Sequence, residues 1–164
     1  NNWVGSTKIG TYNDEYLRRA YTAFGGLAAN IPFEQNYLST TKTGSGATLN
    51  CSTNNYKIHF EANALPKVNA MWGFWSITLY QFNSGIALYD NELDRYALGT
   101  NTDILQFNID GSLDIYIQHD SPSELISNWL PAPAAPFLLM IRMYSATMEQ
   151  IYNPNLPAVE LNNV

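Results

Sequence analysis

Five residues in the second half of the chain have side chains that could bind a ligand. Two are arginines on predicted strands, one is a histidine at a strand end, and two are aromatic: Arg95, Arg142, His119, Trp129 and Tyr144. Guanidinium groups bind anions, and a histidine in a cleft can act as a general base. Aromatic rings contact the apolar faces of sugars. These residue types predict a ligand-binding site. They do not assign a catalytic residue.

Structural roles compete with each of these functional ones. Arg142 lies on a strand that is otherwise apolar, and an unpaired buried charge is very costly. We therefore expect an ion pair with an acid such as Asp94 or Asp114, and an anion-binding arginine facing a pocket is the alternative. His119 ends an apolar row and is interpreted first as a rim residue. Trp129 precedes two prolines in a predicted loop, where it is more accessible than the core tryptophans.

A short acidic segment precedes Arg95. Asp90, Glu92 and Asp94 could supply the two carboxylates that hydrolyse a glycosidic bond. Acidic loop residues also cap backbone amides, so the structural interpretation is a turn in which Glu92 or Asp94 pairs with Arg95. The sequence favours the second interpretation.

Metal and cofactor sites are not expected. The chain has two histidines, and zinc sites need three or four ligands at compact spacing. Asp114, His119 and Asp120 form an accidental set rather than a metal site. The sequence contains no Ser-His-Asp order, phosphate-binding loop or dinucleotide fingerprint.

The composition excludes several classes of partner. The 164 residues carry a net charge of −6, and only 13% of them are charged, about half the usual share. Nucleic acid and anionic membranes need clustered basic residues, which are absent here. No apolar run reaches the ~20 residues that span a bilayer. The neutral polar surface favours an extracellular, periplasmic or virion-associated location over a nuclear one.

The single cysteine excludes an internal disulfide bond. Cys51 has no second cysteine to pair with, so the core alone must stabilise the fold. It also lies within Asn50-Cys51-Ser52, a rare form of the glycosylation sequon.

One helix is predicted near the N-terminus, over about residues 13–29. Asn13 is a plausible N-cap, and acidic residues follow it in the first turn. Apolar residues then repeat at helical spacing and predict a buried stripe: Tyr16, Ala20, Ala23, Phe24 and Leu27.

From residue 33 the apolar residues recur with a period of two, which is typical of strands. The predicted strands are Glu34–Thr41, Ala47–Cys51, Tyr56–Phe60, Met71–Phe82, Ile86–Tyr89, Arg95–Leu98, Ile104–Asn108, Ser112–His119, Pro136–Ser145 and Ala158–Leu161. Asp110-Gly111 predicts a hairpin turn. This pattern predicts a mainly β protein, an antiparallel β-sandwich or jelly-roll with one N-terminal helix. Residues 1–164 are expected to form a single domain, with the sandwich over about 33–161.

Several segments together resemble a known family. They read YLRRAYTAFGGLAANIP (16–32), NYKIHFEANALPKVNAMWGFWSITLY (55–80), NELDRYALG (91–99), NIDGSLDIYIQHDSP (108–122), NWLPAPAAPFLLMIRMY (128–144) and PAVEL (157–161). The chain resembles the domain of unknown function 1214 family over about residues 12–161. The resemblance implies the C-terminal half of larger bacterial proteins with a second domain, numbered 1254, or a stand-alone viral or bacterial copy. It implies a β-sandwich preceded by a helix and no agreed reaction.

Two functions remain open at this point. The first is a non-enzymatic module that binds a glycan or protein, as part of a particle or homo-oligomer. The second is a saccharide-active hydrolase or lyase that uses carboxylates near 90–94 or His119 for acid–base chemistry. The lack of a catalytic constellation favours the first.

Overall fold

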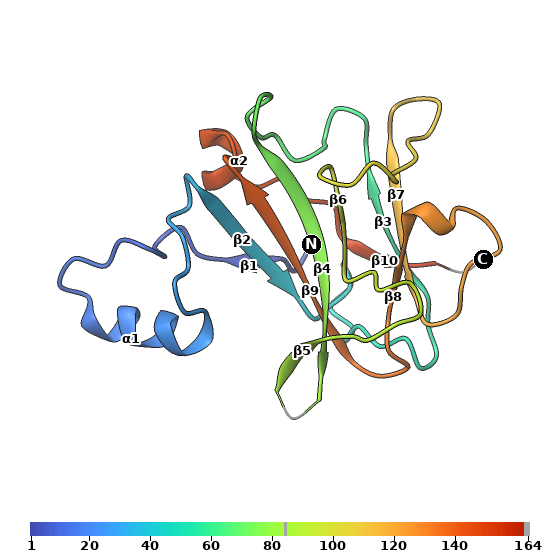
Figure 1. Ribbon diagram of the computed structural model, residues 1–164, viewed down its shortest axis with the longest axis horizontal. Coiled ribbons are helices and arrows are strands. Elements are labelled where there is room, and N and C mark those ends of the chain that lie inside the picture. The colour runs from blue at the N-terminus through green and yellow to red at the C-terminus, as the bar shows by residue number, and fades with distance from the viewer. Residues whose placement is uncertain (84, 163–164) are drawn as a thin grey trace.

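Two facing β-sheets form the centre of the computed structural model, which describes residues 1–83 and 85–162 (Figure 1). In the first sheet the order is β1-β2-β9-β4-β5, with β6 also paired to β4, and in the second it is β10-β3-β7-β8. The strands are β1 (Val4–Gly5), β2 (Gln35–Thr40), β3 (Tyr56–Phe60), β4 (Phe74–Phe82), β5 (Ile86–Leu88), β6 (Ala97–Gly99), β7 (Leu113–Gln118), β8 (Trp129–Pro131), β9 (Phe137–Tyr144) and β10 (Val159–Leu161). The helices are α1 (Tyr16–Gly25), the 3-10 turn η1 (Ile126–Asn128) and α2 (Met148–Tyr152). The prediction of a mainly β fold with an N-terminal helix is confirmed.

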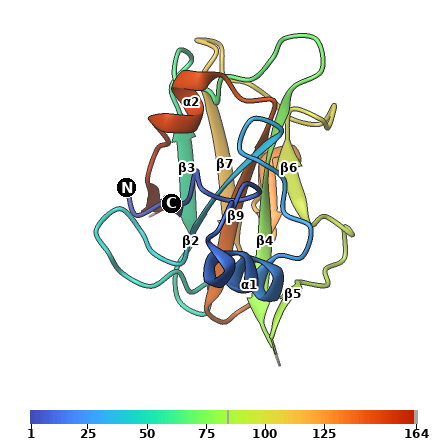
Figure 2. The same ribbon diagram turned by 90° about the vertical axis from the view of Figure 1, so that its left-hand side faces the viewer.

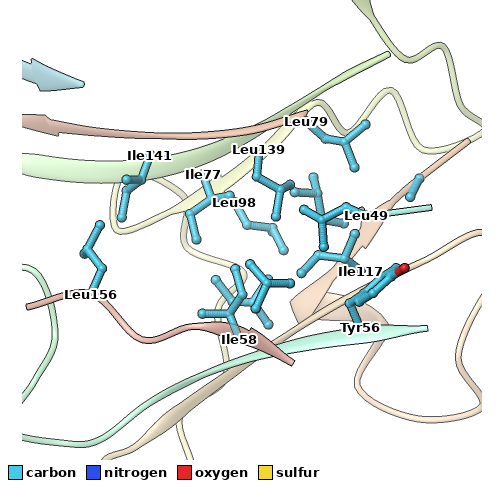
Figure 3. Packing of buried hydrophobic residues seen from close by; sticks show 14 of the residues in the cluster. Leu49, Tyr56, Ile58, Ile77, Leu79, Leu98, Ile117, Leu139, Ile141 and Leu156 are labelled. Atoms are coloured by element: carbon cyan, nitrogen blue, oxygen red, sulfur yellow. The ribbon is translucent and has the colours of Figure 1, made fainter. Parts of the chain in front are cut away.

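The core lies between the sheets and follows the alternation of the strands. On β3 the residues Tyr56, Ile58 and Phe60 are buried, and their neighbours are half-buried. On β9 the residues at 137, 139, 141 and 143 are fully buried, and the residues between them point to the opposite side. Figure 3 shows the two sets of apolar side chains meeting between the sheets. Burying each large apolar side chain stabilises the fold by about 1.5–3 kcal/mol relative to exposure.

β4 is an inner strand of the first sheet, next to β9. It pairs with β9 on one side and with β5 and β6 on the other. The strand begins at Phe74 rather than at Met71, and Met71 and Trp72 are exposed. Gly99 allows β6 to pair closely here, since a Cβ at this position would lie 2.1 Å from the Trp75 carbonyl oxygen.

Two predicted strands are wrong. Segment 47–51 pairs only through the isolated bridges Lys42↔Thr48 and Asn50↔Pro136, although Leu49 is fully buried. Segment 104–108 forms no strand, because the Gln106 backbone bonds to the Asn128 side chain instead of to a strand. Short α2 was not predicted, and its first turn is capped by the Thr147 hydroxyl, which accepts from the Gln150 N–H.

The N-terminal helix differs most from its prediction. It runs over Tyr16–Gly25, and Glu15, not Asn13, occupies the N-cap position. None of its residues is buried, so the predicted buried stripe is wrong. Figure 1 shows α1 projecting from the sandwich on a long excursion between β1 and β2.

Cys51 is buried in the core and is expected to be chemically inert in the folded protein. Burial raises the pKa of its thiol to about 12. At pH 8 about one thiol in 10⁴ would then be ionised, so labelling by a thiol reagent should be on the order of 10³-fold slower than in the unfolded chain. Ellman's reagent measures both rates, with the chain in guanidinium chloride as the reference. Rapid labelling in native buffer would contradict the burial of this thiol.

Candidate ligand-binding cleft

A cleft of about 620 Å³ lies where the β5–β6 loop faces the ends of β7 and β8. The loop contributes Tyr89, Asp90 and Glu92, and the segment after β7 contributes His119 and Asp120. The cleft volume falls in the ~300–1,000 Å³ range of small-molecule sites.

Asn91 gives the β5–β6 loop its shape. Its side-chain Oδ1 accepts from the N–H groups of Leu93 and Arg95, and its Nδ2 donates to the carbonyls of Tyr89 and Arg95. Asparagine commonly closes loops in this way, because its amide mimics a peptide unit. The side chain therefore fixes the wall that carries Asp90 and Glu92.

Arg95 joins the two walls of the cleft. Its Nη1 donates to the carbonyl of Trp129 at 2.8 Å and to the carbonyl of Ile126. Partial burial lowers the pKa of Arg95, and the side chain remains a cation in proteins. The predicted ion pair with Glu92 or Asp94 is wrong, because the guanidinium bonds to carbonyls across the cleft instead. Arg95 is thus a positioning residue.

Trp129 lines the cleft, and its neighbour Asn128 lies buried behind it. Trp129 starts β8, which runs parallel to β7, so its predicted place in a loop is wrong. Its Nε1 donates to the Gln118 carbonyl at 3.0 Å, and only 8% of the residue is exposed. Asn128 donates to the carbonyls of Gln106 and Asp114 and accepts from the Gln106 N–H. Trp129 therefore contributes a mostly buried indole to the cleft rather than an open stacking platform.

His119 is exposed at the cleft with a defined tautomer. Its Nδ1 donates to the Ala132 carbonyl at 3.0 Å, since a carbonyl oxygen can only accept. In the neutral ring Nε2 is then an acceptor available to a ligand. The rim position predicted for His119 agrees with its exposure.

The cleft is negatively charged. Three carboxylates line it, from Asp90, Glu92 and Asp120, and no lysine or arginine is among its described lining residues. The negative charge near the cleft also acts on Tyr96. Desolvation and the charges of Asp94 and Asp90 raise the pKa of its phenol. The charge of the cleft therefore disfavours anionic ligands.

The other two sequence candidates lie away from the cleft. Arg142 and Tyr144 are on the outer face of the first sheet, which we define as its surface turned away from the core. Arg142 donates to the Thr78 hydroxyl at 3.0 Å and the Tyr80 hydroxyl at 2.7 Å. The predicted ion pair of Arg142 with Asp94 or Asp114 is wrong. Tyr144 stacks on Phe74, with ring centroids 4.1 Å apart.

A second polar cluster, on β3 and β7, was not predicted. His59 and Asp114 are paired in the sheet register, and His59 Nδ1 lies 2.7 Å from Asp114 Oδ1. Burial acts to raise the pKa of Asp114, but hydrogen bonds from His59 and Asn108 and the charge of Lys57 outweigh it and lower that pKa. Within residues 1–83 and 85–162 no cluster of three or more metal-ligating side chains occurs, so this pair is not part of a metal site there.

The fold and the cleft define a β-sandwich module with an acidic site at one sheet end. The family model described as "Protein of unknown function (DUF1214)" matches residues 34–148, so the chain belongs to this family. The predicted family is thereby confirmed, while its two-domain context and a viral or bacterial source stay predictions. No curated protein matches the chain.

Two solved structures have a similar fold. The VPA0106 protein from Vibrio parahaemolyticus is 26% identical with a TM-score of 0.71, over 88% of this chain and 34% of its own. An uncharacterised protein from Burkholderia cenocepacia is 13% identical with a TM-score of 0.55, over 83% of this chain and 31% of its own. The chain thus spans about a third of the length of these relatives. In the part of the chain that the structure describes, no helix is long and apolar enough to cross a membrane.

Proposed function

We propose that the chain is a binding module whose cleft takes a neutral saccharide. The observation that carries the proposal is the lining of the cleft, which combines three carboxylates with Tyr89 and Trp129 and holds no lysine or arginine among its described residues. Carboxylates accept hydrogen bonds from sugar hydroxyls, and aromatic side chains contact the apolar C–H faces of the ring.

The positions of the polar groups suit recognition of several hydroxyls at once. Asp90 and Glu92 stand on the wall shaped by Asn91, and Asp120 stands opposite, beside His119. Because Arg95 ties the walls together, these acceptors are held before a ligand arrives, which reduces the entropy lost on binding.

Acid–base catalysis on a saccharide is the second candidate. One observation favours it: His119, whose Nδ1 bonds to the Ala132 carbonyl, lines the same cleft as Asp90, Glu92 and Asp120. A general base and a carboxylic acid in one cleft are the minimum for cleaving a glycosidic bond or eliminating across a uronide. The non-enzymatic module is preferred because no described contact pairs His119 with a carboxylate.

A glycan array followed by calorimetry tests the proposal. We expect wild-type protein to bind neutral glycans, and the double change Asp90→Asn and Glu92→Gln to weaken binding at least tenfold, because hydrogen bonds to charged groups contribute about 1.5–3 kcal/mol each. Asp103→Asn, an exposed carboxylate outside the cleft, is the matched control and should bind like wild type. Absence of binding to any neutral glycan, or binding unaffected by the double change, would overturn the proposal.

The same bound glycan separates the two candidates. Incubation with wild-type protein and with His119→Gln, followed by a reducing-end assay, shows whether cleavage occurs. Release of new reducing ends by wild type but not by H119Q would establish the catalytic function. Intact glycan in both samples leaves the cleft as a binding site alone.

A further inference from the structure

Helix α1 carries apolar side chains that no part of its own copy buries. Tyr16, Leu17, Tyr21 and Phe24 are 70–95% exposed. At about 100° per residue these side chains share one side of the helix, and Arg18 and Arg19 lie on the other. A monomer rarely exposes so many large apolar groups together, so this side of the helix indicates an interface.

The long segment that carries α1 between β1 and β2 is anchored to the sandwich at both of its ends. We call residues 11–30 the arm. Gly10, at φ +84°, packs against Ile31, and a Cβ at residue 10 would lie 2.6 Å from the Ile31 nitrogen. At the other end the Asn30 backbone N–H donates to the Tyr37 hydroxyl, and the Asn30 side chain donates to Gln35. The arm is thus fixed to β2 at its base and projects from the sandwich (Figure 1).

The outer face of the first sheet has a complementary character. Phe82, Ile86 and Leu88 are 44–63% exposed at its β4–β5 end. Leu138 and Met140 continue this apolar surface on β9, half-buried. Figure 2 shows α1 in front of the sheet, but the exposed fractions of its side chains show that it does not pack on this surface.

We propose that two copies of this chain associate about a two-fold axis, each packing its arm on the outer face of the other. One chain carries both complementary surfaces, which is what a self-complementary interface requires. Each aromatic side chain can bury roughly 150–250 Å² of surface, so the exposed groups of one arm offer several hundred Å² for burial. The area buried by two arms and by the two faces they cover would together exceed the ~1,200–2,000 Å² that a stable interface buries.

Charge complementarity supports the same partner. Arg142 stands on the outer face with two hydroxyls as its hydrogen-bond partners, and no ion pair to it is found in the described chain. Asp14 lies just before the apolar side of α1, and Glu15 pairs with Arg18. An arm from the second copy would bring the carboxylate of Asp14, just before the helix, to a face that carries an arginine.

Sedimentation velocity over a range of concentrations tests the proposal. We expect wild-type protein to dimerise, and Leu17→Asp with Phe24→Asp to raise the dissociation constant at least about 100-fold, because interface energy concentrates in a few large apolar residues. Ile109→Asp, a fully exposed apolar residue in the turn before β7, is the matched control and should leave the dimer unchanged. Because α1 buries nothing in one copy, the arm variant should unfold thermally like a wild-type monomer.

Mixing two variants identifies what the arm packs against. Leu88→Asp with Phe82→Asp on the outer face should also abolish the dimer. An equimolar mixture of the arm variant and the face variant should form a heterodimer, since one intact arm still meets one intact face. A wild-type chain that stays monomeric, or a mixture that does not associate, would overturn the proposal; the first result fits an arm covered by a different polypeptide and the second fits arm-to-arm packing.

Discussion

Replacing Asn128 by alanine is expected to lower the free energy of unfolding by about 2–4 kcal/mol, because each buried group left without its partner costs about 1–3 kcal/mol. The Asn128 side chain is almost fully buried. It satisfies the Gln106 N–H, the Gln106 carbonyl and the Asp114 carbonyl, at 2.7–2.9 Å. Alanine can replace none of these bonds, and the β7–η1 contact would loosen as a result.

Chemical and thermal unfolding measure this effect. The midpoint of thermal unfolding should fall by roughly 4–16 °C, given about 2–4 °C per kcal/mol for a chain of this length. Ser127→Ala is the neighbouring control, since the Ser127 hydroxyl makes one long bond of 3.3 Å to the same side chain. Equal stability of the N128A and S127A proteins would show that the Gln106 segment does not depend on Asn128.

The face assignments of the strands were predictable because they depend only on local alternation. Buried and half-buried residues alternate along β3 and β9, as the period of two from residue 33 predicts. The partners of outward residues were not predictable in the same way. Arg142 meets Thr78 and Tyr80, 64 and 62 residues away, through a strand pairing that the pattern does not specify.

The helix illustrates the same limit. Periodicity correctly indicated an amphipathic helix near its observed bounds, but it contains no information on which surface covers the apolar side. A buried stripe assumes a partner within the same chain. The exposed α1 shows that the assumption fails here, because no part of the described chain covers the apolar side of the helix.

The sequence singled out some of the residues that line the cleft, but not the cleft itself. His119 and Trp129 are close in sequence to the ends of β7 and β8, and the acidic segment 90–94 was recognised, so three of its components were identified. These residues come together because β7 pairs in parallel with β8. A prediction built on hairpins assumes antiparallel pairing and does not anticipate this arrangement. The His59–Asp114 pair was missed for a related reason. The sequence of one strand does not specify the register with its neighbour, and this register places the two residues opposite each other.

Arg95 offers the sharpest test of how the cleft is held together. Arg95→Ala is expected to weaken saccharide binding at least tenfold and to lower stability by about 1–3 kcal/mol, because two carbonyls lose a charged donor. Arg95 does not line the cleft itself, so a loss of affinity would report on the separation of the walls rather than on a lost ligand contact. Calorimetry on the glycan bound by wild type gives the affinity, and denaturant unfolding gives the stability.

Two further variants separate the causes. Arg95→Lys keeps the charge and can donate to one or both carbonyls from a shorter side chain, so it should recover part of the affinity. Arg19→Ala removes the same charge from the exposed side of α1 and should leave binding unchanged. If the alanine variant binds as wild type does while its stability falls, the walls are held by Asn91 and the strand pairing alone, and Arg95 has no part in the binding site. If affinity falls for R95A and recovers in part for R95K, the guanidinium is the link that keeps the acidic wall opposite His119.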